Sequence, residues 1–166
     1  MSDILYSPWR LQYILSQKIE KCIFCIRPSA EDDNKHLILH RTKHSFVIMN
    51  MYPYNNGHLM AVPFNHVSSL TDLSKEEIDD LFETVQLCEK VLRSNYNPDG
   101  LNIGINLGRA AGAGIDTHLH VHVIPRWSGD VNFMTAVNGT RVIPESFERA
   151  YSELKKHFEI VMNSQE

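Results

Sequence analysis

The pattern of hydrophobic and polar positions predicts one long amphipathic helix in the middle of the chain. Over residues 74–95, apolar side chains recur three and four positions apart, which places them on one face of an α-helix. Ser74 and Glu77 have the spacing of a capping box, so we expect the helix to begin just after Ser74. Its predicted apolar face, which includes a cysteine expected in the core, consists of Ile78, Leu81, Phe82, Val85, Cys88 and Leu92.

Short apolar segments bounded by Gly, Pro, Asn and charged residues predict strands on both sides of that helix. Two further helices are expected, a short one near residues 7–14 and a closing one at 144–158, where Pro144 suits a first helical turn. Runs of strands with few inserted helices favour an α+β fold with a mainly antiparallel sheet. The predicted strands are residues 37–39, 45–50, 58–63, 101–107 and 118–124.

The last predicted strand carries a histidine at every second position. Side chains two apart on a strand share a face, so His118, His120 and His122 would line one side, while Leu119 and Val121 face the core. Charged imidazoles spaced about 6.5 Å apart lower one another's pKa, so at least one ring should be neutral at neutral pH. A neutral imidazole is a base, a nucleophile or a metal ligand.

Three functional interpretations of this histidine strand stay open. In the first, His118 and His120 form the His-x-His metal pair of a zinc-dependent hydrolase. In the second, His120 attacks phosphorus directly and its neighbours assist. In the third, the chain is a regulator that binds a nucleotide without turning it over.

The overall composition narrows the classes of partner. At 166 residues the chain fits a single domain, and its hydrophobic and charged fractions of 43% and 22% are ordinary. A net charge of −4 argues against nucleic acid or an anionic membrane as partner and leaves a small-molecule nucleotide open. No apolar run approaches the roughly 20 residues that span a bilayer, and no secretory signal is recognised. Three cysteines do not make a disulfide framework, which favours a cytoplasmic protein.

A second candidate site is the pair Cys22-x-x-Cys25. Alone, this spacing is compatible with redox chemistry, with a metal site or with no function. A redox pair would favour a thioredoxin-like βαβ context, which the predicted elements do not provide. A closed tetrahedral zinc site would need two more ligands.

The histidine strand and the Pro125-Arg126 pair after it resemble the histidine triad family of nucleotide hydrolases and transferases. Asn50 and the segment 57–63, Gly-His-Leu-Met-Ala-Val-Pro, are similar to that family's first strand pair. The resemblance runs from about Cys22 to Trp127. Further segments resemble the bacterial diadenosine-polyphosphate phosphorylase-like branch, namely Trp9-Arg10-x-x-Tyr13, Tyr52–Asn55, the stretch from Arg126 to Phe133 and Val142–Pro144.

The resemblance implies a fold and an organisation. We expect a histidine-triad-like α+β fold with about five antiparallel strands and helices on one side, its sheet continued across a homodimer. The single domain, residues 1–166, would consist of an N-terminal arm (1–20), a triad core (21–127) and a C-terminal extension with the closing helix (128–166).

The resemblance also implies catalytic roles. His120 would attack the α-phosphorus of a dinucleoside polyphosphate and form a nucleotidyl-histidine, with its other ring nitrogen bonded to a backbone carbonyl. His122 would lie close to the phosphate and its leaving group, and Asn50 would bind the ribose. We expect His58 to back this strand and to hold the triad by a hydrogen bond.

The loop before the histidine strand is expected to contact the phosphates. Its small residues let backbone N–H groups approach an anion, and we take Asn106, Gly112 and Gly114 as substrate-binding candidates together with His122. Family members commonly have Gln or Ser where this chain has Gly114, so either water or inorganic phosphate can be the acceptor. Arg109 is either an anion contact or a surface residue.

The resemblance further implies a structural zinc site. Family members with the cysteine pair take a third ligand from a histidine three residues after the proline of the Gly-His strand, and a fourth from the first triad histidine. Here the four ligands would be Cys22, Cys25, His66 and His118. His118 would then hold metal while His120 reacts.

Overall fold

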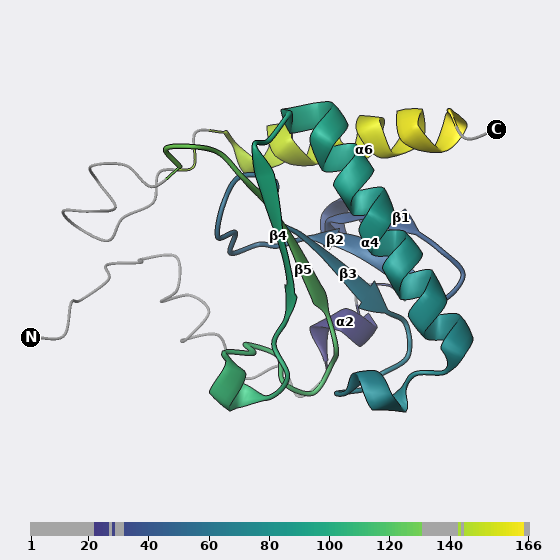
Figure 1. Ribbon diagram of the computed structural model, residues 1–166. Coiled ribbons are helices and arrows are strands. Elements are labelled where there is room, and N and C mark those ends of the chain that lie inside the picture. The colour runs from purple at the N-terminus through teal and green to yellow at the C-terminus, as the bar shows by residue number, and fades with distance from the viewer. Residues whose placement is uncertain (1–21, 27, 29–31, 131–142, 144, 165–166) are drawn as a thin grey trace, which may run out of the picture.

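The computed structural model describes residues 22–26, 28, 32–130, 143 and 145–164. Its centre is a five-stranded antiparallel sheet with the strand order β1-β2-β3-β5-β4, as expected (Figure 1). The predicted helix at residues 7–14 and the arm 1–20 lie outside the described residues. The strands are β1 (Ile38–Arg41), β2 (Ser45–Met49), β3 (Leu59–Pro63), β4 (Gly100–Ile105) and β5 (Val121–Arg126).

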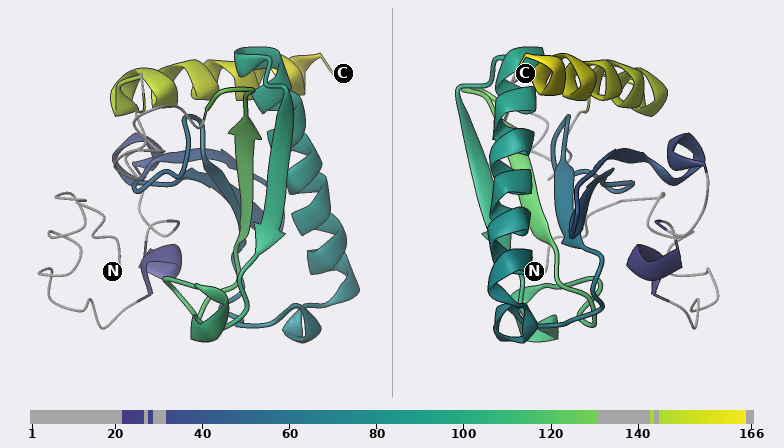
Figure 2. Two further views of the ribbon diagram at one scale, coloured as in Figure 1. Left: turned by 60° about the vertical axis from the view of Figure 1, so that its left-hand side comes forward. Right: turned by 90° about the vertical axis from the view of Figure 1, so that its right-hand side faces the viewer.

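Two long helices, α4 (Lys75–Tyr96) and α6 (Phe147–Asn163), pack on one face of the sheet and confirm the expected arrangement. The short helix α2 (Ile23–Ile26) lies on the opposite face, and Figure 2 shows strands of the sheet between α2 and α4. The alternation of side chains explains both cores: Leu59 and Ala61 of β3 face α4, while Met60 and Val62 face α2. The remaining short elements are α3 (Asp33–His36) and the 3-10 turns η1 (Leu70–Asp72) and η2 (Arg109–Ala111).

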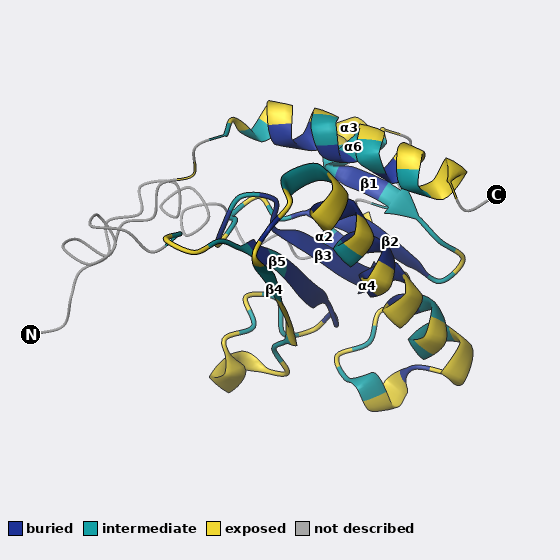
Figure 3. Ribbon diagram, turned by 45° about the horizontal axis from the view of Figure 1, so that its top comes forward, coloured by how far each residue is buried: buried dark blue, intermediate teal, exposed yellow. Residues whose placement is uncertain are grey.

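Helix α4 begins where its capping box predicts. The Ser74 hydroxyl accepts a hydrogen bond from the Glu77 N–H, and the Glu77 carboxylate accepts one from the Ser74 N–H. Cys88 is fully buried, as expected, but Phe82 is 46% exposed and does not belong to the buried face. Phe82 stands at the margin of the apolar stripe, and the outer side of α4 is exposed (Figure 3).

The closing helix is shifted from its predicted bounds. Its first residue is Phe147, because the Ser146 hydroxyl caps the helix by accepting a hydrogen bond from the Arg149 N–H. The helix continues to Asn163 rather than ending at Phe158. Pro144, the expected first residue, lies outside the described residues.

The histidine strand also differs from its prediction, because β5 begins only at Val121. Strand β3 ends at Pro63, which has no N–H for a ladder hydrogen bond. The preceding residues find other partners: the Leu119 N–H donates to the Val67 carbonyl. The alternation of faces nevertheless persists, since Leu119 is buried beside Val121 and Val123 in the core under α4.

None of the helices in the described part of the chain combines the length and the apolar character needed to cross a bilayer.

Candidate functional site

Four buried histidines meet on the sheet face that carries α2. His122 of β5 pairs with Met60 of β3, whose side chain faces α2, and His120 lies one pleat earlier. His58 stands just before β3, and its ring centroid is 5.0 Å from that of His122. The exposed fractions of these rings, His118 included, lie between 1% and 8%. Such burial favours neutral imidazoles.

One hydrogen bond fixes the tautomer of His120. Its Nδ1 lies 2.9 Å from the His118 carbonyl oxygen, which can only accept, so Nδ1 carries the proton. Nε2 therefore keeps its lone pair. Burial lowers the pKa of His120 below its ordinary value, although the hydrogen bond to the carbonyl opposes that shift. His120 is thus a neutral imidazole with a free nucleophilic nitrogen.

A hydrogen-bonded chain fixes the opposite tautomer on His122. The Tyr54 N–H donates to Nδ1 of His58 at 3.1 Å, so the proton of His58 is on Nε2. That Nε2–H donates to Nδ1 of His122 at 2.9 Å, which leaves the proton of His122 on its own Nε2. Burial, reinforced by the neighbouring imidazoles, lowers the pKa of His58 to about 3 and that of His122 to about 4. The contact between His58 and the triad matches the expected hydrogen bond.

The two rings are direct neighbours with complementary chemistry. The centroids of His120 and His122 are 4.8 Å apart and their planes are nearly perpendicular. One ring offers a lone pair at Nε2 and the other offers an N–H at Nε2. A nucleophile beside a hydrogen-bond donor can attack phosphorus while charge on a departing oxygen is stabilised.

A cluster of metal-ligating side chains lies beside this pair. It contains Cys22, Cys25, His66 and His118, whose ligand atoms all lie within 4.8 Å of one another. Nδ1 of His118 is 3.3 Å from Sγ of Cys22 and 3.2 Å from Nδ1 of His66. Nε2 of His118 bonds to the Pro63 carbonyl at 2.9 Å, so the lone pair of His118 is on Nδ1, facing the cluster.

The donor set fits a tetrahedral cation. Bonds of about 2.0 Å to nitrogen and 2.3 Å to sulfur at tetrahedral angles put neighbouring ligand atoms about 3.3–3.8 Å apart. Sγ of Cys25 lies 3.2 Å from Nδ1 of His66 and 3.6 Å from Nδ1 of His118, close to that spacing. The Pro63 carbonyl orients the His118 ring in the way that outer partners orient metal-bound histidines. His120 does not belong to this cluster, which disfavours the zinc hydrolase with a His118–His120 metal pair.

The expected substrate-binding residues belong to two loops, and of those outside the triad only Asn50 has a described contact with the histidines. Asn50 follows β2; its Oδ1 accepts from the Tyr52 N–H at 2.9 Å, and its Nδ2 lies 3.3 Å from Nδ1 of His58. Asn106, Gly112 and Gly114 belong to the loop between β4 and β5, where Gly112 has a φ of 92°. In the same loop, Arg109 pairs with Asp116 at 2.7 Å.

Two aromatic residues of the site were missed at the sequence level. Phe24, between the paired cysteines, has its ring centroid 5.1 Å from that of His120 and is 1% exposed. Tyr54 has its ring centroid 4.8 Å from that of His58 and 5.8 Å from that of His122, and is 50% exposed. The available signals were the position of Phe24 inside the Cys-x-x-Cys pair and that of Tyr54 inside the segment Tyr52–Asn55, which resembles the phosphorylase-like branch.

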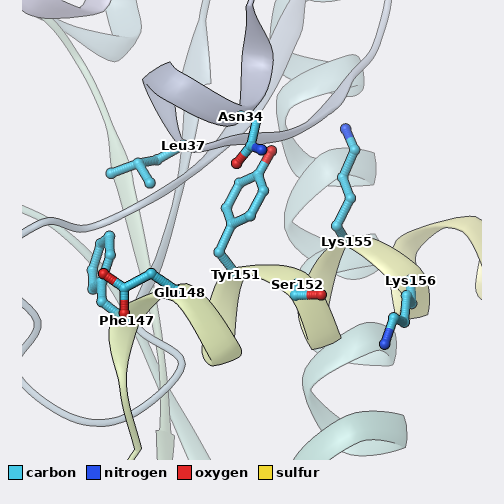
Figure 4. Close-up of a pocket in the computed structure, with 8 residues that line it drawn as sticks. All are labelled: Asn34, Leu37, Phe147, Glu148, Tyr151, Ser152, Lys155 and Lys156. Carbon is cyan, nitrogen blue, oxygen red and sulfur yellow. The ribbon is translucent and has the colours of Figure 1, made fainter.

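A groove between α3 and α6 is separate from this site. Tyr151 and Lys155 line it, and both donate hydrogen bonds to carbonyls of β1, so these groups attach α6 to the sheet edge (Figure 4). None of the clustered histidines lines the groove. The full lining is Asn34, Leu37, Phe147, Glu148, Tyr151, Ser152, Lys155 and Lys156.

The family model and the curated relatives that match this chain all point to the histidine triad family. The family model of the HIT (histidine triad) domain matches residues 31–129. A Mycobacterium tuberculosis protein named AP-4-A phosphorylase is 38% identical over 149 residues, covering 85% of this chain and 76% of its own. A Dictyostelium discoideum bis(5'-adenosyl)-triphosphatase is 32% identical over 119 residues, covering 72% and 78%.

Solved structures agree with this fold. A crystal structure of a Zn-bound histidine triad family protein from Mycobacterium smegmatis has a TM-score of 0.68 and 26% identity, covering 87% of this chain and 97% of that one. The HIT model spans more than half of the chain, and the AP-4-A phosphorylase match exceeds 30% identity with most of both sequences aligned. This chain belongs to the HIT domain family.

Proposed function

We propose that this protein is an enzyme that transfers a nucleotidyl group from a dinucleoside polyphosphate to Nε2 of His120, and then to phosphate or water. The observation that carries the proposal is the pair of opposite tautomers on His120 and His122. A free lone pair and an N–H side by side are what displacement at a phosphorus atom requires.

The proposed first step forms a P–N bond and breaks a P–O bond. Nε2 of His120 attacks the α-phosphorus, and the bond to the bridging oxygen of the polyphosphate breaks. Nε2–H of His122 donates a hydrogen bond to that oxygen as its negative charge grows. In the second step an oxygen of phosphate or water attacks the same phosphorus, and the electron pair of the P–N bond returns to Nε2 of His120; when water attacks, one of its protons is released to solvent.

The names of the relatives support the substrate class. An AP-4-A phosphorylase and a bis(5'-adenosyl)-triphosphatase both act on dinucleotides, as their names state. We assign ribose recognition to Asn50, and phosphate contacts to the backbone of Asn106, Gly112 and Gly114. Small residues in that loop leave room for phosphate oxygens near the N–H groups.

We also propose that the Cys-His cluster binds zinc with a structural role. Cys22, Cys25, His66 and His118 would hold the ion, which would connect α2, the segment after β3 and the segment before β5. Four protein ligands leave no open position for substrate, as in closed structural sites. The ion therefore takes no part in the proposed chemistry.

We propose a homodimer in which β4, an edge strand with Ile103 46% exposed, pairs with its copy in a second chain. We also retain the division into an arm (1–20), a triad core (21–127) and a C-terminal extension (128–166). A reducing cytoplasm suits the reduced thiols that zinc binding requires.

Product analysis tests the proposed function. The protein is incubated with diadenosine tetraphosphate, with and without inorganic phosphate, and the nucleotides are separated. Formation of ADP and ATP only when phosphate is present indicates phosphorolysis, and AMP and ATP indicate hydrolysis. Failure to cleave the substrate under either condition contradicts the proposal, and His120→Ala is the inactive control.

A further inference from the structure

We propose that Tyr54 is the stacking surface for the second base of the substrate, the base that departs with the leaving nucleotide. This inference rests on the proposed function. It assigns a specificity-determining role to an exposed ring next to His58 and His122 that the reaction chemistry does not itself require.

The order of the rings places Tyr54 on the side of the donor histidine. Phe24 contacts His120 with a centroid distance of 5.1 Å, and His120 contacts His122 at 4.8 Å. Tyr54 contacts His122 at 5.8 Å and His58 at 4.8 Å. The two aromatic residues thus flank the histidine pair, Phe24 on the nucleophile's side and Tyr54 on the donor's side.

The direction of the displacement assigns the two sides to the two halves of the substrate. The group that becomes attached to His120 stays with the nucleophile, whereas the leaving oxygen lies opposite the attacking nitrogen and close to the donor, His122. The departing nucleotide therefore extends on the side of His122. There its base would meet the ring of Tyr54.

Exposure separates the two aromatic residues. Phe24 is 1% exposed and packs in the core under α2, so its ring faces have no room for a base. Tyr54 is 50% exposed although it contacts two buried histidines. A half-exposed aromatic ring at the edge of a polar site can stack on any nucleobase.

The backbone around Tyr54 is held in place, so stacking would not require ordering of a loop. The Tyr54 N–H donates to His58, and the adjacent Asn55 side chain donates to the Pro125 carbonyl at 3.0 Å and to Asp130 at 2.9 Å. Asp130 also accepts two hydrogen bonds from Arg126, which ends β5. A ring on such a fixed backbone binds its ligand with little loss of conformational entropy.

The test compares two ligands that share the phosphate chain. Diadenosine tetraphosphate carries the second nucleoside, and adenosine tetraphosphate lacks it. Dissociation constants are measured for both in the His120→Ala background, with Tyr54 intact or replaced by Ala or Phe. Turnover of diadenosine tetraphosphate is measured with Tyr54→Ala, Tyr54→Phe and the control Phe82→Ala, which truncates an exposed ring on α4.

We expect Tyr54→Ala to raise the dissociation constant of diadenosine tetraphosphate by roughly tenfold or more, which is the scale of one base stack. The dissociation constant of adenosine tetraphosphate should rise by less than about twofold. KM should rise while kcat changes little, because the stack is present in both ground and transition states. Tyr54→Phe and Phe82→Ala should behave like the unaltered protein.

The assignment of Tyr54 is overturned if Tyr54→Ala weakens the binding of both ligands equally, or if it weakens the binding of neither. A fall in kcat with unchanged affinity also overturns it, because the ring would then act by supporting His58 and His122. These outcomes differ from failure of the proposed function, in which the unaltered protein neither cleaves the dinucleotide nor forms an adduct; the Tyr54 assignment would fail with it.

Discussion

Two neighbouring histidines of the site hold their ring protons on opposite nitrogens, and short-range contacts explain why. A backbone carbonyl accepts from Nδ1 of His120, whereas Nδ1 of His122 accepts from His58. His58 is itself oriented by the Tyr54 N–H. The chemistry of His122 therefore depends on a residue that touches no substrate in our proposal.

Replacing His58 tests this dependence. His58→Leu removes the donor to His122, so His122 can place its proton on either nitrogen and we expect kcat to fall by about tenfold or more. His58→Gln restores an N–H donor and should recover part of the loss. Rapid-quench measurement of nucleotidyl-enzyme formation checks both variants. Equal rates for Leu and Gln would show that His58 acts by packing alone.

The protonation state of His120 predicts the pH profile. Only the neutral ring has a lone pair at Nε2, so protonation stops the attack. Burial lowers the pKa of His120 from 6.5, hence the neutral form persists as the pH falls through 6.5. We expect kcat/KM to decline on the acid side with an apparent pKa below 6.5. A midpoint at or above 6.5 in a pH–rate series would contradict this account.

At the scale of elements, the close approach of Gly57 to Tyr96 of α4 positions the neighbouring His58. Gly57 has a φ of +70°, and an added Cβ would lie 2.6 Å from Cε2 of Tyr96 near the end of α4. The chain before β3, which carries His58, can approach α4 this closely only because Gly57 has no side chain.

Gly57→Ala is therefore expected to lower the free energy of unfolding by about 2–4 kcal/mol, from the left-handed backbone and from overpacking against Tyr96. Urea unfolding measures the change. Gly100→Ala is the matched control, since a Cβ there meets nothing within 4 Å and its φ is not positive. If the two variants lose similar stability, the contact with Tyr96 has no special weight.

Elements defined by neighbours along the chain were predictable from sequence. The capping box and apolar spacing of α4 depend on residues three and four apart, and the structure confirms them except at Phe82, which is exposed. The start of β5 was misplaced because it depends on Pro63, which is distant in sequence, and the start of α6 because the Ser146 cap was not recognised.

The site divides in the same way. The grouping of histidines and cysteines followed from motif spacing and family resemblance, and the structure brings the four ligands together. The positions of Phe24 and Tyr54 beside the histidines could not be predicted in this way, since their rings contact His120 and His122, which are far away in the chain. A single aromatic residue in a loop or in a four-residue helix carries no local pattern that reveals such a contact.

At the scale of the whole molecule, the Cys-His cluster brings together three separate segments of the chain. Cys22 and Cys25 belong to the α2 region, His66 follows β3, and His118 precedes β5. A bound ion would cross-link these segments and position the His118 carbonyl that orients His120. Its loss should therefore affect stability before chemistry.

We expect about one zinc ion per chain. Chelation, or Cys25→Ser, should lower the melting temperature by on the order of 10 °C, as a loss of several kcal/mol does in a domain of this size. Calorimetry and elemental analysis check this, and Cys88→Ala, at the buried cysteine outside the cluster, should keep the zinc content of the unaltered protein. If chelation abolishes turnover at once in a protein that stays folded, the ion is catalytic and our assignment is wrong.

The central claim is that His120 becomes covalently bonded to phosphorus in each catalytic cycle. The most direct measurement mixes the protein with diadenosine tetraphosphate labelled at the α-phosphorus, denatures it within milliseconds at alkaline pH, and locates the label by peptide mass spectrometry. We predict an adenylylated peptide modified at His120 and absent from His120→Ala. Label at another residue, or catalytic turnover with no labelled protein at any time, would contradict the account.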